Sequence, residues 1–442
     1  MAPAPFTWEI REIGLQVAGL MTADMIRRRL PAPVAADRIL VPGRCRGDLE
    51  PLGAHYGVPV VRGPEELKDL PRFFNRKAGA GDLSRYDIDI FAEIVDAPRL
   101  AVDAIVARAA RLRADGANVI DLGCLPATAF PHLEEAVQAL KAEGHRVSVD
   151  SLETGELLRG GREGADYLLS LTADTLWVAE EVAATPVLIP RQPADEESLY
   201  RAVETLSRKG RPFLADAILD PIPFGLLSSL CRYQRLRERF PAADIMMGIG
   251  NVTELTEADT SGINAVLFGI AAELKAKAVL ATQVSNHARR AVREADVARR
   301  VMYQAREMAS LPKGFSEALM TVHAKHPFPD SEEEIDATAR AVKDPSFRVQ
   351  ISPRGLHVYN RDGHHVATDP FALFPRLGLE ADGGHAFYMG VELARAETAW
   401  TLGKRYSQDQ PLDWGCAADR AGEDRLAQCA PGPTRQPATA RE

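Results

Sequence analysis

A short stretch between two glycines, Gly116 to Gly123, constrains the fold of this chain more than any other part of it. A helical segment ends at Asp115–Gly116, and an apolar run follows that carries a single acid, Asp121, near its end. Apolar runs of this length flanked by glycine are typical of a strand that is covered on both faces of a parallel sheet. A carboxyl group in such a strand is unfavourable unless a polar group meets it. Asp121 therefore indicates either a polar partner in a neighbouring loop or a ligand.

The same order of strand, polar residue and helix recurs along the chain. Eight apolar segments alternate with helical stretches over roughly 240 residues, which matches a (β/α)8 barrel in number and length. The segments lie at residues 88–94, 116–123, 146–151, 164–171, 186–190, 213–220, 244–251 and 278–283. Six of the eight end in a polar residue: Glu93, Asp121, Asp150, Ser170, Asp220 and Asn251. Because the carboxyl ends of barrel strands meet at one face, we expect these six side chains to converge on one site.

The length of 442 residues indicates that other units flank the barrel. We expect a small α/β unit at residues 1–84, the barrel at 85–325, a small α+β unit at 331–415 and a disordered tail at 416–442. The front unit is short for a doubly wound domain, as though its first strand and helix were missing. In the rear unit, His364, His365, His385 and Glu392 lack the spacing of a metal site on one element, and we favour ordinary polar surface.

Composition limits the classes of function. No apolar run is long enough to cross a membrane, and the start of the chain lacks the pattern of a secretory signal. The five cysteines are scattered without metal-ligand or disulfide spacing, which fits a reducing compartment. The net charge of -9 argues against nucleic acid as a partner. We therefore expect a cytoplasmic protein that binds neither nucleic acid nor membranes.

Three motifs of the expected barrel resemble the pterin-binding barrel of dihydropteroate synthases. They are Gly116–Gly123, Val147–Ser151 and Leu219–Pro221, in the order found in that family, and the resemblance covers roughly residues 86 to 310. The whole chain is similar to the dihydropteroate synthase-like proteins of archaea and methylotrophic bacteria, which share the motifs Pro42–Asp48 and Asn360–Asp362. That group is associated with the synthesis of tetrahydromethanopterin, a one-carbon carrier.

The resemblance implies which residues hold a pterin, because carboxylates deep in a barrel can accept hydrogen bonds from the N–H groups of the pterin ring. The residues assigned to pterin binding are Asp121, Asp150, Ser170, Asp220 and Asn251. Asn251 also resembles the asparagine of the Gly-x-Ser-Asn motif of methyltetrahydrofolate-dependent methyltransferases. Glu93 stands where the family has a metal-linked asparagine, and we expect it to bind Mg²⁺ through hard oxygen ligands. Glu93 and Asp150 are the candidate catalytic residues.

The basic residues that hold diphosphate in the family are replaced in this sequence. The family has a lysine after strand seven and an Arg-x-His on strand eight, where this chain has Asn251-Val252 and Gln283–Ser285. Arg289 and Arg290, which open the helix after strand eight, are the residues we expect to meet phosphate.

These observations favour a dihydropteroate synthase-like transferase of tetrahydromethanopterin synthesis, which joins a dihydropterin diphosphate to an arylamine. Two alternatives remain open. One is methyl transfer from a methylated pterin to a corrinoid partner, suggested by Gly248–Thr253, which needs no diphosphate-binding residues. The other is a non-catalytic, pterin-binding scaffold. We expect a homodimer or a biosynthetic complex.

Overall fold

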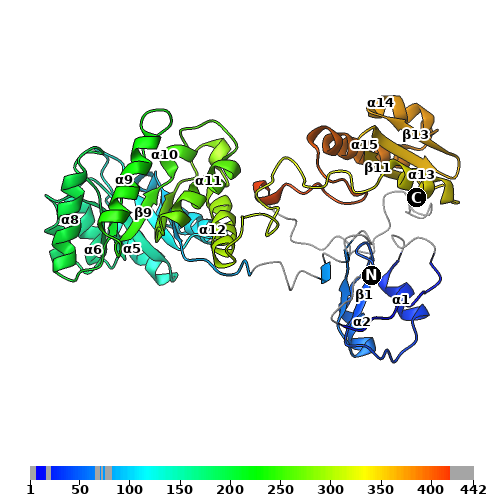
Figure 1. Ribbon diagram of the computed structural model, residues 1–442, viewed down its shortest axis with the longest axis horizontal. Helices are drawn as coiled ribbons and strands as arrows, with labels where there is room; N and C mark the ends of the chain where they lie inside the picture. Colours follow the sequence, from blue (N-terminus) through cyan, green and yellow to red (C-terminus); the bar gives the residue numbers. More distant parts are fainter. Residues whose placement is uncertain (1–5, 16–20, 65–69, 71–72, 75–81, 419–442) are drawn as a thin grey trace. The chain divides into compact units, whose positions relative to one another are not determined.

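The computed structural model describes residues 6–15, 21–64, 70, 73–74 and 82–418. The chain divides into two compact units (Figure 1). One unit combines the residues before Gly81 with His326–Leu412, and the other combines Gly81–Lys325 with Asp413–Ala418. The domain boundaries expected from the sequence stay predictions. Within the described part of the chain, no helix is both long and apolar enough to cross a membrane.

The second unit is a closed barrel of eight parallel strands in the order β10-β3-β4-β5-β6-β7-β8-β9. Its strands are β3 (Asp89–Ile94), β4 (Val119–Gly123), β5 (Arg146–Asp150), β6 (Tyr167–Leu171), β7 (Thr185–Leu188), β8 (Leu214–Ala215), β9 (Asp244–Gly248) and β10 (Ala278–Ala281). The helices between and after them are α4 (Val102–Ala114), α5 (Leu133–Ala142), α6 (Thr154–Arg162), α7 (Val178–Glu181), α8 (Glu196–Arg208), α9 (Leu226–Arg239), α10 (Gly250–Thr253), α11 (Thr260–Glu273) and α12 (Ala291–Glu307). This order confirms the predicted (β/α)8 fold.

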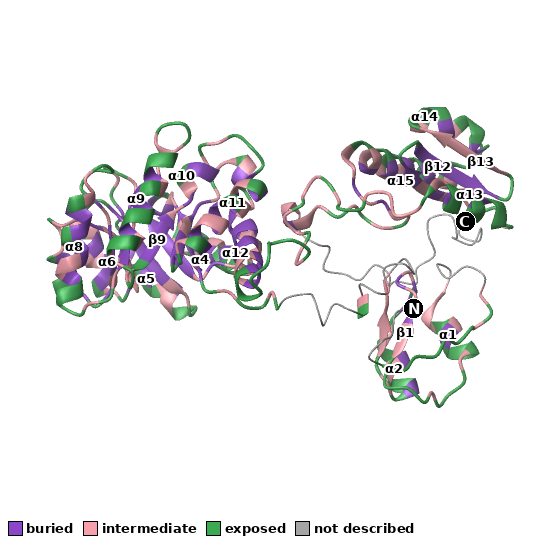
Figure 2. Ribbon diagram, in the orientation of Figure 1, coloured by how far each residue is buried: buried purple, intermediate pink, exposed green. Residues whose placement is uncertain are grey.

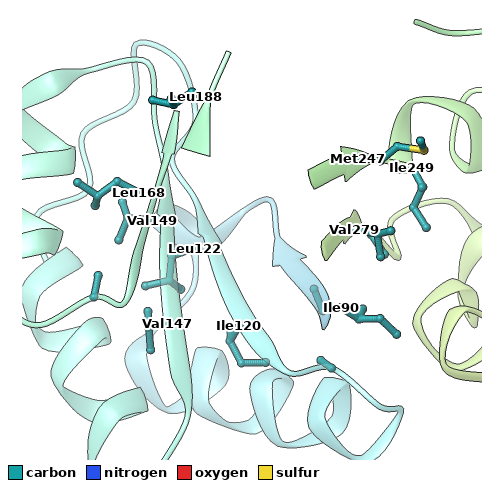
Figure 3. Packing of buried hydrophobic residues seen from close by; sticks show 14 of the residues in the cluster. Ile90, Ile120, Leu122, Val147, Val149, Leu168, Leu188, Met247, Ile249 and Val279 are labelled. Carbon is teal, nitrogen blue, oxygen red and sulfur yellow. The ribbon is translucent and has the colours of Figure 1, made fainter. Parts of the chain in front are cut away.

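Alternation of side chains along each strand gives the barrel two separate cores, and the strands are accordingly buried (Figure 2). Side chains that point outward, such as Ile90, Ile120 and Val147, pack in the larger core (Figure 3). A smaller core, which we call the inner core, comprises Phe91, Val119, Leu169, Val187, Leu214, Met246 and Ala278.

The residues two positions after three members of the inner core are acids. Phe91, Val119 and Leu214 are followed at that spacing by Glu93, Asp121 and Asp216. Because side chains two positions apart point to the same face, a polar layer lies above the apolar filling, toward the carboxyl ends of the strands.

Several strands end earlier than the sequence predicts, and in two of them the difference moves a predicted site residue off the strand end. β8 stops at Ala215 rather than continuing to Asp220, because the chain turns where Ile218 has a φ of 62°. β9 stops at Gly248, and the short helix α10 begins at Gly250, so Asn251 stands on a helix and not at a strand end. Both runs stay apolar beyond the strand because Ala217, Leu219 and Ile249 are buried in the larger core. The period of the sequence does not distinguish such residues from a strand.

The described residues of the other unit form two small sheets. The parallel pair β1 (Ile39–Val41) and β2 (Val60–Arg62) lies with α1 (Ala23–Arg29) and α2 (Glu50–Tyr56). The antiparallel sheet β11 (Arg348–Ser352), β12 (Gly355–Asn360) and β13 (Gly363–Ala367) lies with α13 (Glu332–Ala341), α14 (Pro370–Leu373) and α15 (Gly383–Leu402). The sequence analysis missed α13 and β13.

The first residues of the expected tail belong to the described part of the chain. Gly415–Ala417 form a 3-10 helix, η6, in which Cys416 is buried and donates its backbone N–H to Ala318 O at 2.8 Å. Residues 419–442 lie outside the described part of the chain.

Candidate functional site

Three carboxyl groups from adjacent strands meet near the carboxyl end of the barrel. Glu93, Asp121 and Asp150 each offer one oxygen, and these three oxygens lie within 4.8 Å of one another. The strand register places them there: Glu93 stands opposite Asp121, and Asp150 stands opposite Gly123, two positions after Asp121. We call these three residues the carboxylate cluster.

The carboxylate cluster has few donors of its own. The hydroxyl of Ser148 donates to Oδ1 of Asp121, and Oδ2 of Asp121 has no hydrogen-bond partner although the residue is 0% exposed. Glu93 and Asp150 are half-buried. Within the described residues, no lysine or arginine forms an ion pair with any of the three. A buried acceptor without a donor is uncommon in folded proteins and indicates a missing ligand, cation or proton.

The electrostatics of the carboxylate cluster follow from burial and from like charge. Burial raises the pKa of Glu93 to about 8, and the nearby charges of Asp150 and Glu254 add to the rise. Burial, together with Glu93, raises the pKa of Asp121 to about 8. The pKa of Asp150 is also well above its usual value, first through burial and then through Asp121 and Asp216. Strongly perturbed carboxyl groups grouped in this way mark candidate functional sites.

Gly123, at the end of β4, makes room for the carboxylate of Glu93. A Cβ on Gly123 would lie 2.5 Å from Glu93 Oε1 and 3.0 Å from the Cα of Val95. Any side chain at this position would therefore push the Glu93 carboxylate away from its two neighbours. The sequence analysis treated Gly123 only as the boundary of a strand, since a contact between strands is invisible in the sequence.

Asp216 is a further acid at this end of the barrel, and the sequence analysis missed it. Oδ1 of Asp216 accepts from the hydroxyl of Tyr233 and from the N–H of Ile218 at 2.7 Å. Burial raises the pKa of Asp216 to about 6, against the lowering effect of these donors. A sequence feature that could have predicted Asp216 is its spacing of two residues from Leu214, which repeats the spacing of Glu93 from Phe91.

The structure does not bring the other predicted pterin residues into the carboxylate cluster. Asp220 forms an ion pair with Arg232 at 2.8 Å. Asn251 is exposed, and its Nδ2 donates to Leu219 O at 2.7 Å. Ser170 is half-buried and lies where the pairing of β6 with β7 shifts register. The role of these three residues in pterin binding stays a prediction.

Glu254, after α10, shows how a carboxylate at this end looks when its donors are present. It accepts from the N–H groups of Val284 and Ser285, both at 2.8 Å. Burial acts to raise the pKa of Glu254, but these donors hold the pKa below its usual value. The pKa values of Glu254 and Asp121 therefore differ because Glu254 has hydrogen-bond donors, and not because of burial alone.

The two arginines predicted to meet phosphate have other contacts. Arg289 is exposed and donates to Asn286 O at 3.1 Å. Nη2 of Arg290 lies 3.8 Å from Oδ1 of Asp115, and its Nε lies 3.5 Å from Cys416 O. Phosphate binding by these residues stays a prediction.

The histidines of the rear unit do not form a metal centre with Glu392. His364 contacts His357 at 3.0 Å between ring nitrogens, and His385 pairs with Asp382. Glu392 is buried rather than on the surface, and it accepts from Tyr406 and Arg395. Over the described residues, the carboxylate cluster alone brings three possible metal ligands together.

Exposed apolar side chains surround the same end of the barrel. They lie between a strand and the next long helix, or in the first turn of that helix, after five different strands. They are Leu152, Trp177, Ile222, Phe224, Leu227, Leu255 and Val284, and we call them the apolar rim.

Comparisons with known proteins give partial matches. Residues 1–65 match a family described as "Family of unknown function (DUF6513)". An uncharacterized protein of Methanocaldococcus jannaschii is 26% identical over 466 residues, covering 85% of this chain and 87% of that protein.

Among solved structures, the barrel is similar to dihydropteroate synthases. The Yersinia pestis enzyme with a pterine-sulfa conjugate is 19% identical with a TM-score of 0.39, over 51% of this chain and 95% of that one. The Xanthomonas albilineans enzyme in complex with 7,8-dihydropteroate is 17% identical with a TM-score of 0.39, over 52% of this chain and 98% of that one. At these TM-scores the assignment of the barrel rests on its own closed strand order.

Proposed function

We propose that the barrel binds a dihydropterin at the carboxyl ends of its strands and joins the pterin to an arylamine, in the synthesis of a folate-like one-carbon carrier of the tetrahydromethanopterin type. The observation that carries this proposal is the unpartnered Oδ2 of Asp121 among buried carboxylates. These groups call for a ligand that donates several hydrogen bonds from one flat edge. The amide and amino edge of a pterin is such a donor, and charge-assisted bonds to it are strong.

The number and fixed positions of the carboxylate acceptors favour a pterin over a simple cationic metabolite as the ligand. Asp150 lies close enough to both Asp121 and Asp216 for their charges to raise its pKa. Asp216 already has donors for Oδ1 from the protein. A row of fixed acceptors suits a planar ring with a fixed pattern of donors better than it suits a flexible amine.

The apolar rim supports the aromatic half of the product. A dihydropterin that occupies the carboxylate cluster would direct its 6-methylene group away from the acids, toward loops that carry exposed apolar side chains. Aromatic rings bury a large apolar area against such side chains. An arylamine therefore fits the second substrate better than a charged aliphatic amine does.

The reaction we propose is a displacement at the pterin methylene. The lone pair of the arylamine nitrogen forms a C–N bond to the methylene carbon as the C–O bond to diphosphate breaks. Diphosphate leaves with the electron pair of that bond, and the nitrogen then loses its proton to solvent. The predicted roles are pterin binding for Asp121, Asp150, Ser170, Asp220 and Asn251, and phosphate binding for Arg289 and Arg290.

Incubation of the full chain with 6-hydroxymethyl-dihydropterin diphosphate, Mg²⁺ and an arylamine tests the proposal. We expect a condensed product by mass spectrometry with ribofuranosylaminobenzene phosphate, with 4-aminobenzoate as the alternative acceptor. An ordinary dihydropteroate synthase with its own substrates serves as the control. Tight pterin binding without product from either amine would favour a pterin-binding scaffold, and no pterin binding at all would overturn the proposal.

A further inference from the structure

We propose that Glu93, Asp121 and Asp150 together form a binding site for one hard divalent cation, such as Mg²⁺ or Mn²⁺. The sequence analysis expected Mg²⁺ at Glu93 alone and gave the two aspartates to the pterin. The proposal instead makes the carboxylate cluster a three-ligand site, formed by three adjacent strands of one barrel.

The positions of the three oxygens suit such a cation. With metal–oxygen distances of 2.0–2.1 Å, neighbouring ligands of an octahedral ion lie about 3 Å apart and opposite ligands about 4.2 Å apart. The three oxygens already lie within 4.8 Å of one another, so small side-chain movements are enough. The backbone register of β3, β4 and β5 holds the ligands, and Gly123 leaves the space that the Glu93 carboxylate occupies.

One buried oxygen without a partner points to a missing group at this place. It is Oδ2 of Asp121, in a residue that is 0% exposed. A divalent cation supplies a ligand bond to this oxygen.

The ligand set selects the class of ion. The cluster holds three carboxylates and neither a cysteine nor a histidine. Carboxylate oxygens suit Mg²⁺, Mn²⁺ and Ca²⁺, whereas Zn²⁺ sites in proteins rely mainly on sulfur and imidazole nitrogen. An arginine or lysine from the chain does not take this place in the described residues, so the negative charge is left for an ion from solution.

If the proposed function holds, the cation also fits the chemistry of the barrel. A leaving diphosphate needs positive charge near it. In this chain Asn251-Val252 and Gln283–Ser285 stand where the resembling family has basic residues. A divalent ion at the carboxylate cluster supplies that charge, while Glu93 and Asp150 each keep a second oxygen that can accept from a pterin N–H group.

Titration of the full chain with MnCl₂, in metal-free buffer without pterin, tests the inference by electron paramagnetic resonance of free Mn²⁺ and by calorimetry. We expect one site, weakened roughly tenfold or more in Glu93→Gln and in Asp121→Asn. Gly123→Ala keeps all three carboxylates but displaces Glu93, and we expect it to weaken binding as well. Asp89→Asn is the control, since it removes an acid at the opposite, amino end of β3, and its effect should stay within about threefold.

Thermal unfolding of each variant separates loss of the site from loss of the fold. Absence of Mn²⁺ binding at millimolar concentration to the folded wild type would overturn the inference. Equal affinity in Asp121→Asn and wild type, or an equal loss in Asp89→Asn, would overturn it too. Pterin binding is measured separately in EDTA. If the pterin binds there while Mn²⁺ never binds, the inference fails and the proposed function stands; the reverse result overturns the function and keeps the cation site.

Discussion

The two ends of the barrel differ in whether their charged side chains have partners of opposite charge. At the amino end, Asp89 opens β3 and pairs with Arg146 at 3.1 Å. Arg299, which is 1% exposed, donates at 2.8 Å to both Ile88 O and Gly116 O and pairs with Asp296. At the carboxyl end of the same strand β3, Glu93 meets two other acids and no basic residue of the described chain.

We infer from this difference that the amino end of the strands serves stability and that the carboxyl end serves binding. Charges at the amino end are met by partners of the chain itself, which is how a barrel secures its closed sheet. The three acids of the carboxylate cluster, at the carboxyl end, have no basic partner among the described residues, and this agrees with the general division of labour in (β/α)8 barrels. We therefore expect mutations at the two ends to have effects of opposite sign on the stability of the empty protein.

The largest effect is expected at the amino end, in Arg299→Ala. The substitution leaves Asp296 and two backbone carbonyls without their buried donor, and breaking such a network costs about 3–5 kcal/mol. Urea unfolding followed by fluorescence measures the loss. Arg289→Ala, which removes an exposed arginine of the same region of sequence, should change stability by no more than about 0.5 kcal/mol. A loss below about 1 kcal/mol in Arg299→Ala would contradict the comparison.

A smaller effect of opposite sign is expected at the carboxyl end, in Asp121→Asn. In EDTA at pH 7.5, the empty carboxylate cluster must either hold like charges together or take up protons, and both are unfavourable. The amide removes one of these charges and keeps an acceptor for Ser148. We expect the melting temperature to rise by roughly 2–6 °C, for a gain of about 1–2 kcal/mol in a barrel of this size. A fall in melting temperature would mean that Asp121 serves stability, like Asp89.

A third effect concerns the pH dependence of stability and a buried histidine outside the barrel. Burial, together with the charge of His364, lowers the pKa of His357 to about 4, whereas an unfolded histidine titrates near 6.5. The folded chain therefore binds fewer protons than the unfolded chain between these values. The stability that neutral His357 contributes is complete above about pH 6.5 and is lost as pH falls toward 4. His357→Gln should flatten the pH dependence of unfolding of that unit in this window, and an unchanged slope would contradict the assignment.

The sequence was sufficient for the barrel because its strongest signals are local. The ends of β4 and β5 were predicted to within one residue, since each is an apolar run that ends at an acid or a glycine. The same rule failed at β8, where Ala217 and Leu219 extend the apolar run past the end of the strand and drew attention to Asp220 instead of Asp216. The missed elements α13 and β13 are short and polar, so their period is weak.

The site was only partly predictable, because its geometry depends on contacts between strands. Glu93, Asp121 and Asp150 were singled out one at a time, but only the barrel register brings their oxygens together. Asp220 was assigned to the ligand before its ion pair with Arg232 was known. Neither the space left by Gly123 nor the unpartnered oxygen of Asp121 has any signature in the sequence.

The central claim is that the acids at the carboxyl end of the barrel bind a pterin. Calorimetry of 6-hydroxymethyl-dihydropterin binding in EDTA, to wild type and to Asp150→Asn, tests it most directly. The amide must turn a donor toward a ring donor, and loss of a charge-assisted bond costs about 1.5–3 kcal/mol, or roughly ten- to a hundredfold in affinity. Asp89→Asn, at the other end of the barrel, should bind like wild type. Equal affinity in wild type and Asp150→Asn would contradict the claim and would make these acids structural.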